Sequence, residues 1–119
     1  MGADVIYDPV GGEVFDQSIR CINWGGRLLI IGFAGGTIPT LPVNYPLIKG
    51  FSVVGVRAGE FGRRAPILGK ENIDIINSLA DDNKIRPHIC KVFDYKASKQ
   101  ALEYLENRKL IGKVVISID

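Results

Sequence analysis

A continuous apolar run at residues 27–33, with the sequence RLLIIGF, most constrains how this chain folds. A strand with one face in water alternates apolar and polar residues, whereas a strand that is buried on both faces is apolar throughout. Burial on both faces is typical of a parallel sheet that lies between two layers of helices. We therefore expect an α/β fold in which this strand lies inside a parallel sheet.

The preceding residues predict the rest of a strand–helix–strand unit. β-Branched and aromatic residues at 5–7 favour a strand, and the proline and glycines at 9–12 end it in a turn. Apolar residues then recur with helical spacing, namely Phe15, Ile19 and Ile22. We expect the glycine pair at 25–26 to end this helix, the crossover to be right-handed, and the aromatic rings of Tyr7 and Trp24 to pack against neighbouring helices.

The same reasoning predicts further elements along the chain. A short helical turn is expected at residues 44–49, a strand at 51–57 and a helix from Pro66, with strands also at 88–93 and 113–118. The helix from Pro66 carries an apolar stripe of Ile73, Ile76, Leu79 and Ala80. A last helix at about 97–108 should turn Ala101, Leu102 and Leu105 inward.

Composition excludes several classes of function. The chain has 119 residues, which suits one small domain or a fragment, and its formal net charge is only +2. Basic and acidic residues are mixed, so we expect neither a nucleic-acid partner nor a membrane partner. Cys21, Cys90 and His88 cannot complete a four-ligand zinc site, so no metal is expected. The apolar runs are too short to span a bilayer, and we expect a cytoplasmic protein.

Two glycine-rich segments, at residues 10–12 and 32–36, follow predicted strands. Neither has the G-x-G-x-x-G spacing that lets a main chain approach a pyrophosphate at the start of a helix. The pattern therefore predicts the second half of a dinucleotide-binding sheet, without the turn that binds the phosphates.

Five motifs carry a family resemblance, namely DPVGG at residues 8–12, GGRL at 25–28, IGFAGG at 31–36, IRPH at 85–88 and GKVV at 112–115. In this order they resemble the C-terminal portion of NADPH:quinone oxidoreductases, the zinc-free, zeta-crystallin-like branch of the medium-chain dehydrogenase/reductase superfamily. The resemblance implies strands 4-5-6 of a Rossmann-type doubly wound parallel sheet in residues 1–84. Residues 85–119 would then be a strand–helix–strand segment that returns to a GroES-like catalytic domain.

The resemblance also implies cofactor-binding residues. Ile31, Gly32, Phe33 and Ala34 would pass along the nicotinamide ribose, and Val56, Arg57 and Ala58 would line the nicotinamide side. Val10 and Gly11 would border the adenosine side, and Arg108 would pair with a phosphate. Ordinary turns, strand-end packing and an exposed arginine at the end of a helix are the structural alternatives. Asp8 is interpreted as structural, and no catalytic residue is predicted.

The function implied by the resemblance is hydride transfer from NADPH to a quinone or a similar activated carbonyl compound. We expect the chain to be a C-terminal fragment that is inactive alone and binds the cofactor weakly or not at all, because the pyrophosphate crevice lies between strands 1 and 4. The alternative is a dimerising module without nucleotide binding. In either case the family resemblance implies a homodimer through the strand at residues 51–57, and β-sheet edges favour such pairing.

Overall fold

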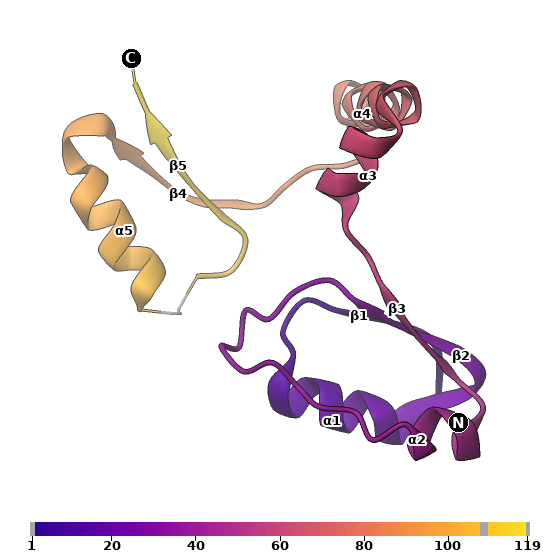
Figure 1. Cartoon of the computed structure of the whole chain (residues 1–119). Coiled ribbons are helices and arrows are strands. Elements are labelled where there is room, and N and C mark those ends of the chain that lie inside the picture. The colour runs from indigo at the N-terminus through magenta and orange to yellow at the C-terminus, as the bar shows by residue number, and fades with distance from the viewer. Residues whose placement is uncertain (1, 108–109, 119) are drawn as a thin grey trace. The chain divides into compact units, whose positions relative to one another are not determined.

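The computed structural model describes residues 2–107 and 110–118, in two compact units that divide after Pro66. The first unit contains β1 (Ala3–Asp8), α1 (Gly12–Cys21), β2 (Ile22–Ile30), α2 (Asn44–Lys49), β3 (Ser52–Gly55) and α3 (Ala58–Arg64) (Figure 1). Its strands form a parallel sheet in the order β1-β2-β3. This arrangement confirms the predicted α/β class and gives the neighbour relations expected for strands 4-5-6.

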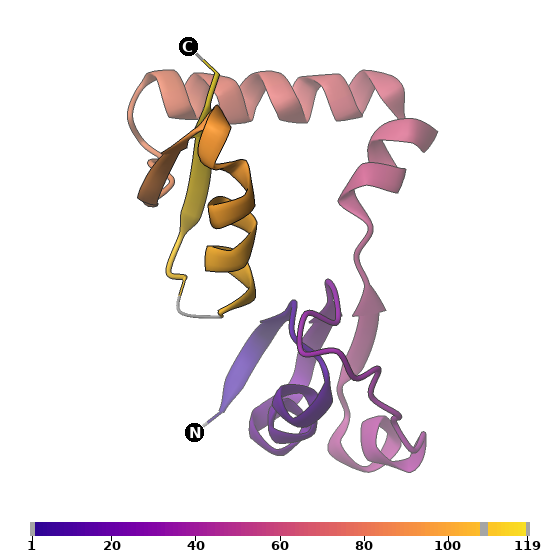
Figure 2. The ribbon, with the colours of Figure 1, turned by 90° about the vertical axis from the view of Figure 1, so that its left-hand side faces the viewer.

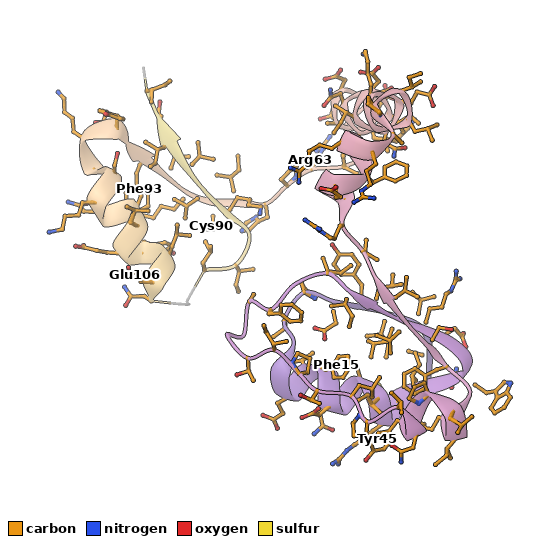
Figure 3. All side chains as sticks on the ribbon, in the orientation of Figure 1. Phe15, Tyr45, Arg63, Cys90, Phe93 and Glu106 are labelled. Carbon is orange, nitrogen blue, oxygen red and sulfur yellow. The ribbon has the colours of Figure 1, made fainter. Side chains whose placement is uncertain are left out.

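The core of the first unit lies between α1 and one face of the sheet. Phe15 and Ile19 of α1 pack with Leu28, whose side chain is fully buried at the centre of β2 (Figure 3 labels Phe15). In register with Leu28 are Ile6 on β1 and Val53 on β3. The helical spacing read from the sequence therefore places α1 on the sheet as predicted.

The opposite face of this sheet is open in the part of the chain that the structure describes. Tyr7, Leu29 and Val54 are aligned across the three strands on that face. Tyr7 is 66% exposed and Val54 is 38% exposed. The expectation that β2 is buried on both faces is therefore wrong for this chain, and so is the expected packing of Tyr7 against a helix.

The glycine pair at 25–26 does not end α1, because the helix stops earlier, at Cys21. Ile22 is already extended and 5% exposed, so its burial in the core begins β2 at this point. Pairing with β1 is irregular here, since Ala3 is opposite Ile22 while Val5 is opposite Arg27. The glycines lie in this irregular stretch of β2, and the Gly25 amide donates to the Gly50 carbonyl at 2.6 Å.

The second unit contains the strand–helix–strand segment predicted near the end of the chain. Its elements are α4, which begins at the unit boundary (Pro66–Asp81), β4 (Ile89–Asp94), a 3₁₀ turn (Tyr95–Ala97), α5 (Ser98–Glu106) and β5 (Lys113–Ser117). The strands β4 and β5 are parallel, and α5 packs against this pair (Figure 2). The rings of Phe93 and Tyr104 meet edge to face, with centroids 5.9 Å apart.

Several predicted packing positions in these helices are not buried. Ala101 on α5 is 1% exposed, but Leu102 and Leu105 are 60% and 41% exposed. On α4, the predicted stripe is also mostly uncovered, with Ile73 and Ile76 at 55% and 49% exposed, while Leu79 is partly buried. A single helix against two strands has too little surface to cover these side chains. The expected domain boundary between residues 84 and 85 stays a prediction.

Candidate functional site

The turns that follow the strands of the first sheet form the candidate site. Asp8, Ile30 and Gly55 are in register, so β1, β2 and β3 end at the same level. In open α/β sheets, ligands bind at this carboxyl edge. The edge brings together nine of the predicted residues, namely Val10, Gly11, Ile31, Gly32, Phe33, Ala34, Val56, Arg57 and Ala58. Arg108 lies outside the described residues.

Asp8 shapes the first of these turns. Asp8 is 2% exposed, and its carboxylate accepts hydrogen bonds from the backbone amides of Val10 and Gly11, each at 2.9 Å. A buried carboxylate that is satisfied by its own turn holds the main chain in one conformation. The structural role predicted for Asp8 is confirmed.

The loop after β2 is attached to that turn by main-chain hydrogen bonds. The amide of Ala34 donates to the Pro9 carbonyl at 3.0 Å, and the amide of Gly35 donates to the Val10 carbonyl at 2.9 Å. The amide of Ile31 donates to the carbonyl of Asp8 at 2.9 Å. The loop and the turn therefore support each other, and these three amides are already used inside the protein.

The glycines of the site permit this contact between loop and turn. Gly11 has φ +72°, and a Cβ atom there would lie 3.0 Å from both Phe33 Cδ1 and the Thr37 carbonyl oxygen. A Cβ at Gly35 would lie 3.0 Å from the Val10 carbonyl oxygen. At both positions the main chain is thus closely approached by another part of the same chain. Gly36, with φ +87°, has open space around it.

The exposed groups at this edge fit one side of a nicotinamide nucleotide. Phe33 is 41% exposed, and Val56 is 36% exposed. The Val56 amide donates a hydrogen bond to the Ile30 carbonyl at 3.0 Å, which continues the pairing of β2 with β3. Apolar faces of this kind suit a flat heterocycle. A pyrophosphate would need other donors, because the amides of Ala34 and Gly35 bond to the neighbouring turn.

The described residues do not form a metal centre. Within residues 2–107 and 110–118, no three His, Cys, Asp or Glu side chains are grouped so that they could hold an ion. Cys21 is exposed and Cys90 is partly buried, and neither forms a disulfide. These residues therefore do not fit a zinc ion. The helices in the described part of the chain are also too short or too polar to cross a membrane.

Sequence reasoning missed α3 and its charged residues. Glu60 lies 2.9 Å from both Arg63 and Arg64, and 4.0 Å from Arg57. The spacing of four between Glu60 and Arg64 was the available signal, because such pairs stabilise helices. Two glycines and a nearby proline have low helix propensity, so the sequence pattern did not predict this helix.

Comparisons with known proteins agree with this architecture. A sequence profile described as zinc-binding dehydrogenase matches residues 1–116. The quinone oxidoreductase-like protein 2 homolog of Nematostella vectensis is 38% identical over 98% of this chain, which spans 32% of that protein. The chain thus has about a third of the length of the curated relatives it matches.

Two solved structures share the fold. A Pseudomonas syringae quinone oxidoreductase has a TM-score of 0.78 at 18% identity, and the match covers 98% of this chain and 36% of that one. A mycobacterial protein complexed with NADPH has a TM-score of 0.79 at 24% identity, with coverage of 98% and 36%. By its sequence profile, this chain belongs to the zinc-binding dehydrogenase family.

Proposed function

We propose that this chain is the C-terminal portion of an NADPH-dependent oxidoreductase that transfers hydride to a quinone or a similar activated carbonyl compound. The observation that carries the proposal is the common edge at Asp8, Ile30 and Gly55, where the turns that follow β1, β2 and β3 converge. The family membership and the likeness to quinone oxidoreductases support it.

In this proposal the chain supplies one wall of the cofactor crevice. Ile31–Ala34 and Val56–Ala58 would run along the nicotinamide and its ribose, while Val10 and Gly11 would border the adenosine side. Arg108 would pair with a phosphate. The bound NADPH would supply the hydride, and the protein would orient it. No side chain of this chain is proposed as an acid or a base.

One wall alone should bind the cofactor poorly. Calorimetric titration of the 119-residue chain with NADPH should give millimolar binding or none, and quinone reduction should be absent. Micromolar binding would show that the second wall is dispensable and would overturn the one-wall proposal.

Complementation tests the functional role itself. The 119-residue chain, mixed with the N-terminal two-thirds of the Nematostella vectensis relative, should restore NADPH-dependent quinone reduction. Phe33→Asp should lower that activity, because it places a charge on the proposed nicotinamide face. Leu47→Asp is the matched control, since Leu47 is 80% exposed on α2. Equal activity of both variants would contradict the assigned face.

The second candidate function is a dimerising module without nucleotide binding. It is favoured by β3, which forms an edge of the sheet and carries Val53 and Val54, each 38% exposed. Edge strands offer unpaired amides and carbonyls to another chain. We propose that two copies pair through residues 51–57, antiparallel about a twofold axis.

The cytoplasmic location of the protein also stays a prediction.

Light scattering during size-exclusion chromatography tests the dimer. The unmodified chain should elute as a dimer, and Val54→Lys should shift it to a monomer. Val43→Lys, at a side chain that is 84% exposed outside the strand, should leave the dimer intact. A folded monomer of the unmodified chain at micromolar concentration would contradict the proposal.

A further inference from the structure

The helix α3 carries three arginines around one carboxylate. Arg63 Nη2 lies 2.9 Å from Glu60 Oε2, and Arg64 Nε donates a hydrogen bond to Glu60 Oε1 at 2.9 Å. Arg57, just before the helix, lies 4.0 Å from the same carboxylate. We call Arg57, Arg63 and Arg64 the arginine cluster; Figure 3 labels Arg63.

The arginine cluster has more positive charge than its partner neutralises. Three guanidinium groups share one carboxylate, which leaves two positive charges in excess. Among the described residues, Glu60 is the only acidic side chain within 4.0 Å of these arginines. The arginine side chains are 73–81% exposed, whereas Glu60 is 24% exposed. Each guanidinium has five N–H donors, so most of them remain available to a ligand.

Stability alone gives little reason for this arrangement. Exposed ion pairs contribute roughly 0–1 kcal/mol to the stability of a protein. One arginine would also satisfy the Glu60 carboxylate as well as three do. What Glu60 does accomplish is to hold two guanidinium groups on one side of α3. Preorganised guanidinium groups match the oxygens of a phosphate and bind it with two parallel hydrogen bonds each.

The position of the cluster relates it to the candidate site. Arg57 is two residues beyond Gly55, the end of β3, and α3 follows at once. The seven residues of α3 span roughly 10 Å at 1.5 Å per residue. The guanidinium groups therefore lie within reach of a ligand that extends from the carboxyl edge of the sheet.

We propose that the arginine cluster binds a phosphate monoester group. The proposal rests on the proposed function in placing this phosphate beside the cofactor edge. The source is a phosphate on the substrate, as in a coenzyme A thioester, because the 2′-phosphate of NADPH belongs to its adenosine end, whereas Arg57 lies on the proposed nicotinamide side. The cluster would then select phosphorylated over unphosphorylated ligands.

Calorimetric titration of the full 119-residue chain at low salt tests the proposal. The probes are coenzyme A against 3′-dephospho-coenzyme A, and NADPH against NADH. Coenzyme A should bind saturably, loss of its 3′-phosphate should weaken that binding by about tenfold, and NADPH and NADH should not differ. A preference for coenzyme A over its dephospho form supports a substrate phosphate at the cluster, whereas a preference only for NADPH over NADH would overturn the proposal.

Charge-matched variants separate a site from general attraction. Arg63→Gln/Arg64→Gln should abolish the preference for the phosphorylated probe. Lys70→Gln/Lys99→Gln removes the same charge from lysines that are 76% and 91% exposed in other helices, and should keep the preference. Loss of preference in both variants, or in neither, would overturn the proposal, as would equal binding of coenzyme A and its dephospho form. The Phe33→Asp complementation assay reports on the proposed function separately.

Discussion

The ammonium group of Lys49, in α2, lies 3.1 Å from the backbone carbonyl oxygen of Arg20, in the last turn of α1. The same ammonium also donates to the carbonyl of Ile19. The last four carbonyls of a helix have no partner within it, and a cation near them also favours the helix dipole. Lys49 therefore caps α1 from a distant part of the chain.

Replacement of Lys49 by Met should destabilise the first unit by about 1 kcal/mol, since the carbonyls lose a charged donor while the aliphatic stem is kept. Urea unfolding followed by circular dichroism measures the change. Lys70→Met, which breaks only an exposed pair with Asp74, should change the unfolding free energy by less than about 0.5 kcal/mol. Equal effects of the two variants would show that the cap contributes nothing.

Removal of the Asp8 carboxylate should open the first turn. Asp8→Ala leaves the buried amides of Val10 and Gly11 without their acceptor and should cost about 2–4 kcal/mol. Asp8→Asn keeps one acceptor oxygen and should cost less. Urea unfolding gives the order of the variants, and faster hydrogen exchange at the Val10 and Gly11 amides should accompany the loss. If alanine were no worse than asparagine, the turn would not depend on this carboxylate.

Substitution at Gly50 should displace the side chain of Trp24. Gly50 has φ +62°, and a Cβ atom there would overlap the Trp24 ring. Gly50→Ala should therefore cost more than the roughly 1 kcal/mol of left-handed strain alone. It should also shift the fluorescence of Trp24, the only tryptophan in the chain.

Gly36→Ala is the control for that strain, because Gly36 has φ +87° and no atom within 4 Å of its Cβ position. It should cost about 1 kcal/mol and leave the tryptophan emission unchanged. Unaltered emission in Gly50→Ala would mean that the ring does not rest on residue 50.

Truncation in the core should show where the first unit derives its stability. Leu28→Ala removes a fully buried side chain between α1 and the sheet and should cost about 3–4 kcal/mol. Leu47→Ala, at a side chain that is 80% exposed, should change the free energy of unfolding by less than about 0.5 kcal/mol. Chemical denaturation of both variants measures the difference, and similar losses would place the core elsewhere.

The sequence by itself determined the class of fold and the edge that carries the candidate site. The apolar run around Leu28 predicted a parallel strand, and the spacing of Phe15 and Ile19 predicted the helix that covers it. The turn residues at 9–12 and 34–36 fell after strands, as expected, although β2 ends at Ile30 and not at the predicted residue 33. These features follow from the local periodicity of side chains, which a sequence displays directly.

Tertiary structure decided what depends on partners that are distant in sequence. Trp24 was expected to pack against a helix, but it is 80% exposed and its ring lies over Gly50, the C-cap residue of α2. The end of α1 at Cys21 follows from the burial of Ile22, not from the glycine pair that sequence reasoning chose. The arginine cluster on α3, in contrast, is local in sequence, and the spacing of Glu60 and Arg64 was a signal for it. Local patterns set which residues are apolar or helical, but the burial of Ile22 and the capping of α1 by Lys49 arise only when separate segments meet.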